Sequence, residues 1–122
     1  TPSSEAVITD QADFALLMAR LTDDPVYGKQ AKAALTDVLQ AMENMLVSDK
    51  ITYTRSAARY VSAFVAGAEK TGSFLKRSHY LKLAEQLVED YLLPSAAADG
   101  SGRAYSSKSI VAVTIRSASA PP

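Results

Sequence analysis

The chain has 122 residues, which fits one domain, and its 48% apolar and 21% charged residues are typical of globular proteins rather than disordered chains. It contains no cysteine, which excludes disulfides, thiolate metal sites and cysteine nucleophiles. Its formal net charge is zero, and no run approaches the ~20 apolar residues that span a bilayer. The first residues lack the pattern of a secretory signal. We therefore expect a soluble protein of the cytoplasm, or of a particle assembled there, without membrane contact.

The first half of the chain predicts two helices. The first covers residues 11–21 with Asp10 as its N-cap, and its apolar side chains recur at the spacing of one helical stripe: Phe14, Leu17, Met18 and Leu21. Asp24 followed by Pro25 is the preferred order of a capping acid and a first helical residue, so a second helix is predicted over 25–47. Its broad apolar face consists of Ala31, Ala34, Leu35, Val38, Leu39, Met42, Met45 and Leu46.

Two more helices follow. The third is predicted over 55–70, with one apolar face that consists of Ala57, Val61, Phe64, Val65 and Ala68. Gly72 is a typical residue just after a helix end, and Ser73 is a typical N-cap for the next helix. The fourth helix is predicted over 74–92 and ends before Pro94, because proline disfavours helix at the residue before it.

The character of the sequence changes after Pro94. Residues 95–109 are mainly Ala, Ser, Gly and Asp without apolar periodicity, which indicates a flexible connection. Residues 110–115 are β-branched and apolar on both faces, which predicts a strand, and 117–122 resemble the start of a tail. The predicted fold is therefore mainly α: a compact four-helix domain over 1–94 with a short C-terminal β element, a strand or hairpin at 110–116, α+β overall.

A lone apolar strand leaves its backbone groups unpaired and attracts partners. Residues 103–107 could pair with it as a hairpin, residues 50–53 could supply another strand, and so could a second copy of the chain. The last possibility predicts a homodimer or homo-oligomer. Its candidate self-association residues are Ile110, Val111, Val113 and Ile115.

Charge is unevenly distributed. Residues 1–49 carry a net charge of −5, whereas residues 50–82 carry +6. This basic block is interleaved with Tyr53, Tyr60 and Tyr80, which is a pattern suited to phosphate contact and base stacking. Its candidate nucleic-acid-binding residues are Lys50, Arg55, Arg59, Lys70, Lys76, Arg77 and Lys82. The alternative is that the basic block packs against the acidic helices of the same chain or of another copy.

Catalytic signals are weak. Ser73 and Lys76 have the Ser-x-x-Lys spacing of serine acylases, but the accompanying motifs of those enzymes are absent, and Ser73 is better explained as a helix cap. His79, the one histidine, has no orienting acid or nucleophile in its local sequence and is expected at the surface. The acidic residues show no metal-ligand spacing. We expect no catalytic residue, no metal and no cofactor.

The sequence favours a non-enzymatic, self-associating structural or assembly module. Abundant alanine and serine, with no cysteine or tryptophan, is similar to the composition of small phage and viral assembly or virion proteins, although no family motif accompanies it. Other proteins of an assembly are then expected as partners. The alternative function is that of a nucleic-acid-binding accessory protein that contacts the RNA or DNA backbone through residues 50–82.

Overall fold

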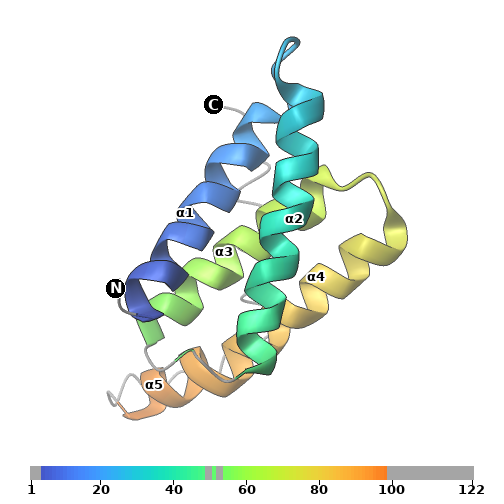
Figure 1. Cartoon of the computed structure of the whole chain (residues 1–122). Coiled ribbons are helices and arrows are strands. Elements are labelled where there is room, and N and C mark those ends of the chain that lie inside the picture. Colours follow the sequence, from blue (N-terminus) through green and yellow to red (C-terminus); the bar gives the residue numbers. More distant parts are fainter. Residues whose placement is uncertain (1–3, 49–50, 52–53, 99–122) are drawn as a thin grey trace.

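Helix α3 (Thr54–Lys70) forms the centre of the fold, with the other helices around it (Figure 1). The computed structural model describes residues 4–48, 51 and 54–98. The remaining elements are α1 (Ser4–Leu21), α2 (Gly28–Val47), α4 (Phe74–Leu87), the π-helical turn η1 (Val88–Leu92) and α5 (Leu93–Ala98). Helices α1 and α4 both pack extensively on α3, and α2 packs mainly on α1. The prediction of a mainly helical protein is confirmed.

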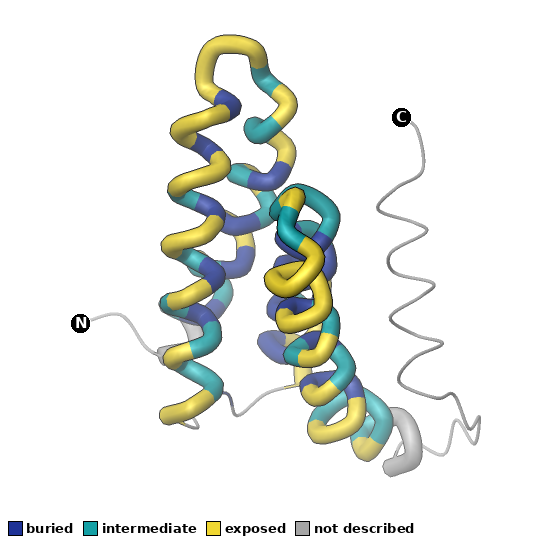
Figure 2. The backbone as a smooth tube through the Cα atoms, turned by 90° about the vertical axis from the view of Figure 1, so that its right-hand side faces the viewer, coloured by how far each residue is buried: buried dark blue, intermediate teal, exposed yellow. Residues whose placement is uncertain are grey.

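The core is built on the broad buried face of α3. Its predicted apolar positions are all buried, and so are Tyr60, Ala63 and Gly67. Figure 2 shows how buried and exposed stretches alternate along the helices. The rings of Tyr60 and Phe64 meet edge to face at 6.0 Å, and Phe64 stacks on Tyr80 of α4 at 6.2 Å. Such ring pairs contribute beyond the area they bury. The bounds predicted for this helix, 55–70, agree with the structure to one residue.

Helix α2 approaches α3 at a glycine. A Cβ built on Gly67 would overlap Cδ1 of Leu39, which is itself buried. A larger residue at position 67 would therefore separate the two helices or displace Leu39 in a dense core. The predicted apolar face of α2 is confirmed, since its members are buried or half-buried.

Helix α1 differs from the prediction in two ways. It begins at Ser4 rather than after Asp10, so Asp10 is a residue of the helix and not its cap. Its buried face consists of Ile8, Ala12, Ala15 and Ala19, whereas the predicted stripe is centred outside this face, with Met18 partly buried against the core. Phe14 is 44% exposed and Leu17 is 52% exposed. The stripe prediction is wrong because the small alanines allow α1 to come close to its neighbours, and the large side chains do not fit in that contact.

The turn between α1 and α2 also corrects a prediction. Oδ1 of Asp24 accepts hydrogen bonds of 2.8 Å from the backbone N–H groups of both Val26 and Tyr27. These bonds keep the pKa of Asp24 below its usual value, because they stabilise the ionised carboxylate. They stabilise a turn over residues 25–27, and α2 begins at Gly28 rather than at Pro25. A Cβ at Gly28 would lie 2.6 Å from the carbonyl oxygen of Thr22, so only glycine fits there.

The connection between α3 and α4 confirms the prediction. Gly72 has φ +69°, the left-handed conformation that favours glycine after a helix end. Ser73 is the N-cap of α4, and its Oγ accepts from the Lys76 N–H at 3.4 Å. The small residue and the capping residue thus reverse the chain direction within three positions.

The end of the fourth helix is where the prediction is wrong. The helix does not stop before Pro94 but continues through η1 into α5, so residues 95–98 are helical and do not belong to a flexible connection. In η1 the Leu93 N–H bonds to the Val88 carbonyl, five residues back. Proline in a regular α-helix clashes with the carbonyl four residues before it. We attribute the continuation to the wider π turn, which relieves that clash.

The predicted β elements are mostly outside the described residues. Residues 110–115, with the self-association candidates, lie there, and so do the rest of 99–122, Lys50 and Tyr53. Ile51 is buried at 3% exposure and belongs to no strand. Within residues 4–48, 51 and 54–98 the structure contains helices and turns but no strand.

Alkaline pH should destabilise the fold through buried tyrosines. Burial raises the pKa of Tyr60, and burial together with the nearby Glu43 carboxylate raises that of Tyr80. A raised folded-state pKa means that this stability is fully present below the unfolded value of about 10 and decreases as the pH rises above it. We expect the free energy of unfolding to decline above about pH 10, and less steeply in Tyr60→Phe.

Urea unfolding followed by circular dichroism between pH 8 and pH 11.5 measures this slope. Tyr60→Phe should cost about 1 kcal/mol at pH 8, because the Tyr60 hydroxyl donates to Gln11 Oε1. The matched control is Tyr27→Phe at an exposed position, which should follow the unmodified protein. Equal alkaline slopes in all three proteins would contradict the assignment.

Candidate functional site

The basic block is partly neutralised by the acidic first half of the same chain. Arg59 Nη1 lies 2.7 Å from Asp13 Oδ1 of α1, and Lys70 Nζ lies 2.7 Å from Asp23 Oδ2 of the α1–α2 turn. These pairs are exposed, so each contributes little stability. They do show that acidic and basic segments pack together within one molecule. This is the arrangement that the sequence left open beside nucleic-acid contact.

The other candidate cations do not form one surface. Arg55 is exposed in the first turn of α3, about 22 Å along the helix from Lys70. Lys76 and Arg77 are exposed in the first turn of α4, beside Lys70, whereas Lys82 is exposed farther along α4. Lys50 lies outside the described residues. The structure therefore gathers Lys70, Lys76 and Arg77 at the α3–α4 turn but separates Arg55 from them.

The tyrosines of the basic block are not available for base stacking. Tyr60 is fully buried and Tyr80 is 7% exposed, both in the aromatic core. Tyr53 lies outside the described residues. The expectation that Tyr60 and Tyr80 present rings to a nucleic acid is wrong, because α3 and α4 need those rings to fill the space between them.

The residues weighed as catalytic have structural partners. Ser73 caps α4 through the Lys76 N–H. His79 Nε2 lies 2.9 Å from Glu43 Oε1 of α2, so the acid that local sequence lacked comes from another helix. His79 is exposed, as predicted, and lies six positions after Ser73 along α4. Ser73, His79 and Glu43 therefore do not form the hydrogen-bonded series of nucleophile, base and orienting acid that nucleophilic catalysis uses.

Two negative findings concern the part of the chain that the structure describes. No three side chains of the metal-binding types gather there in an arrangement that could hold an ion. None of its helices has both the length and the apolar character needed to cross a bilayer.

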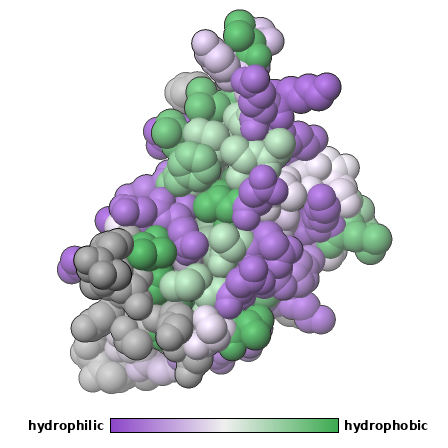
Figure 3. Space-filling model, in the orientation of Figure 1, coloured by the Kyte–Doolittle hydropathy of each residue, from purple (hydrophilic) through white to green (hydrophobic). Residues whose placement is uncertain are grey.

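The structure reveals an apolar outer face on α1, which we define by Val7, Phe14, Leu17, Met18 and Leu21. Phe14 and Leu17 are exposed, whereas Val7, Met18 and Leu21 are half-buried, and Met18 also packs against the core. Apolar side chains gather along α1 and the seam between α1 and α2 on the side seen in Figure 3. The spacing of Ile8, Ala12, Ala15 and Ala19 is the sequence signal for a second, small-residue face, and it could have found this arrangement.

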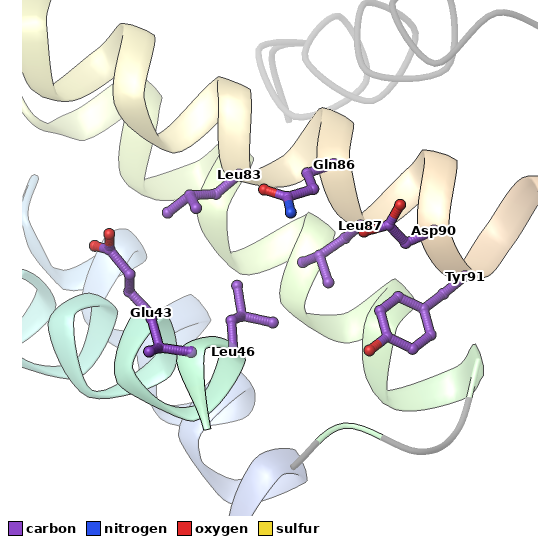
Figure 4. A pocket seen from close by; sticks show the side chains of 8 residues that line it. Glu43, Leu46, Leu83, Gln86, Leu87, Asp90 and Tyr91 are labelled. Carbon is purple, nitrogen blue, oxygen red and sulfur yellow. The ribbon is translucent and has the colours of Figure 1, made fainter. Parts of the chain in front are cut away.

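A second apolar feature is a groove between α2 and the α4–η1 segment (Figure 4). Its volume is about 300 Å³, at the lower end of the range for ligand sites. Leu46, Leu83 and Leu87 line its apolar part, with Glu43 and Asp90 at its borders. No sequence pattern indicated it, because α2 and α4 are distant in the chain and the π turn was not expected.

Comparisons of the chain with protein-family models, with curated proteins and with solved structures find no match.

Removal of the Ser73 hydroxyl should affect stability only. We expect Ser73→Ala to lower the free energy of unfolding by about 1 kcal/mol, the usual effect of losing an N-cap. Ser73→Asp should retain the cap and serve as the control. Thermal or urea unfolding measures both, and an unchanged stability in Ser73→Ala would contradict the capping role.

Proposed function

We propose that this chain is a non-enzymatic structural module that self-associates, with a second copy covering the outer face of α1. The observation that carries the proposal is the reversed polarity of α1, whose alanines are buried while Phe14 and Leu17 are exposed. Contiguous exposed apolar side chains on one helix face are typical of interaction surfaces. Phage or viral assembly is the context that the composition favours, and other assembly proteins are then additional partners.

Dimerisation is favourable only if the whole outer face of α1 is buried in the contact. Full burial of a Phe or Leu side chain is worth about 1.5–3 kcal/mol, so covering the exposed halves of Phe14 and Leu17 contributes about 1 kcal/mol each. In a two-fold symmetric dimer this gain applies to both copies, so each residue contributes twice. Association itself costs at least about 4 kcal/mol in lost freedom, so the half-buried Val7, Met18 and Leu21 are also needed in the contact.

Charge placement favours an antiparallel pair of α1 helices. Asp10 and Arg20 are both exposed and lie on either side of Phe14 and Leu17 in the helix. In an antiparallel pairing centred between Phe14 and Leu17, Asp10 of each copy comes within about one turn of the other copy's Arg20. Opposite charges at both ends of an apolar contact fix its register.

The non-enzymatic part of the proposal is supported by the roles of the reactive side chains. Ser73 serves as a cap, and the His79 ring pairs with Glu43 across the α2–α4 contact. Both roles explain the residue without catalysis.

The test is to place charge on the α1 outer face. Phe14→Lys with Leu17→Lys should convert the dimer to a monomer, because the lysines would be buried unpaired in the contact. Sedimentation velocity from 1 to 200 μM measures the change. The matched control is Phe74→Lys with Leu75→Lys, the same residue types at exposed positions of α4, and it should leave the dimer intact.

An unmodified chain that stays monomeric up to 200 μM would overturn the proposal. A dimer that persists in Phe14→Lys with Leu17→Lys would place the interface elsewhere and overturn the assignment to α1. Circular dichroism checks that the double variant keeps its helix content, which is expected since both positions are exposed.

The alternative function, nucleic-acid contact, is favoured by one observation. Lys76 and Arg77 are exposed in the first turn of α4, which carries no acidic residue to balance them. Because Lys70 is paired with Asp23, Lys76 and Arg77 would engage about two phosphates, which gives a slope of log affinity against log salt of about −1.5 to −2. Binding of labelled RNA or DNA with that slope, lost in Lys76→Glu with Arg77→Glu, would support this function instead of pure self-association.

A further inference from the structure

The groove between α2 and the α4–η1 segment combines an apolar lining with acidic borders. Leu46 comes from α2 and faces Leu83 and Leu87 of α4 across the open space (Figure 4). Glu43 lies at one border and Asp90 at the other. An occupant that complements this groove must present apolar side chains with positive charges beside them.

The exposed apolar area here is not covered by any described part of the chain. Val47 lines the groove and is 85% exposed, although valine is among the residues most often buried in proteins. On the opposite wall, the Tyr91 hydroxyl donates to the Ile51 carbonyl at 3.3 Å, which links η1 to the segment that follows α2. The groove therefore has one wall held by this bond and an uncovered apolar edge.

The π turn shapes this wall. Asp90 and Tyr91 belong to η1, whose extra residue per turn changes the direction of the side chains that follow Leu87. Single π turns within α-helices occur frequently at functional sites. Here the turn contributes two of the lining residues, one charged and one aromatic.

We propose that the chain's own C-terminal segment 108–116 folds back in the same molecule and occupies this groove. The segment carries an apolar run, Ile110 to Ile115, between Lys108 and Arg116. Residues 100–122 contain three bases and no acid, which complements Glu43 and Asp90. The inference does not depend on the proposed function, since the groove and the outer face of α1 are formed by different side chains.

The chain is long enough to reach. Lys108 lies ten positions after Ala98, the end of α5, and ten extended residues span up to about 35 Å. The groove residues from Leu83 to Tyr91 cover only about 12 Å of helix, and α5 follows η1 directly. A tethered segment also has an effective concentration in the millimolar range, which favours it over a second copy at micromolar concentration.

Engineered cysteines test this placement cleanly, because the natural chain has none. In the full chain, Val47→Cys is combined with Val113→Cys, and in a second protein with Val111→Cys, which covers the other face of the segment. Under mild oxidation we expect at least one of these pairs to form an intramolecular disulfide at least tenfold faster than the control. The control pairs the same C-terminal cysteine with Val26→Cys, an exposed valine before the start of α2.

Non-reducing electrophoresis at 2 and 50 μM separates the outcomes. A monomeric cross-linked product whose rate is independent of concentration supports the proposal. A disulfide-linked dimer formed faster than in the control would show that the segment occupies a second copy, and equal rates for groove and control pairs would show that it does not occupy the groove. Either of these two results overturns the proposal.

A charge change provides an independent readout. Asp90→Lys in the double-cysteine protein should slow intramolecular cross-linking by about two- to fivefold, the range expected for one exposed charge pair. Asp37→Lys, at an exposed position of α2, should leave the rate unchanged. An unchanged rate in Asp90→Lys would contradict the role of charge complementarity in the docking.

Discussion

The close approach of α1 to α2 and α3 is the constraint on which the remaining structure depends. It is made mainly by alanines, since Ala12, Ala15 and Ala19 are buried beside Ile8, whereas Leu16 and Met18 pack against the core only in part. Small side chains allow two helix backbones to come near each other, and they leave no room for larger ones in the same contact. Phe14 and Leu17 consequently lie outside, so the packing of the core and the apolar outer face have one cause.

The same approach determines how charge is distributed. Because α1 and the α1–α2 turn lie against α3, Asp13 and Asp23 come within bonding distance of Arg59 and Lys70. Two cations of the basic block are thereby paired with acids from the first half of the chain. Lys76 and Arg77 remain exposed at the α3–α4 turn, and Arg55 and Lys82 are exposed elsewhere. Each exposed pair contributes little stability.

Helix α4 packs on α3 through aromatic rings, and this separates it from α2 along one edge. The Phe64–Tyr80 stack fills the space near the first half of α4, where His79 also reaches Glu43. Farther along, the groove opens between Leu46 and Leu87, with the Tyr91 ring at its end. Pro94 and the π turn extend the helix past this groove instead of ending it, so the wall is longer than an α-helix stopped at proline would provide.

The sequence by itself determined the features that depend on neighbouring residues. The helical class, the bounds of α3, the glycine after it and the Ser73 cap all follow from local propensity, periodicity and capping. The sequence did not determine which apolar face of a helix is buried where two were available. Helix α1 carries two apolar faces, and only the tertiary packing decided that the alanines are buried and that Phe14 is exposed. The sequence also did not reveal the partners of Arg59, Lys70 and His79, because each partner lies 36 or more positions away from its residue in the chain. The continuation of the fourth helix through Pro94 depended on a π turn. A hydrogen bond between residues five positions apart produces no apolar periodicity by which the sequence could have predicted it.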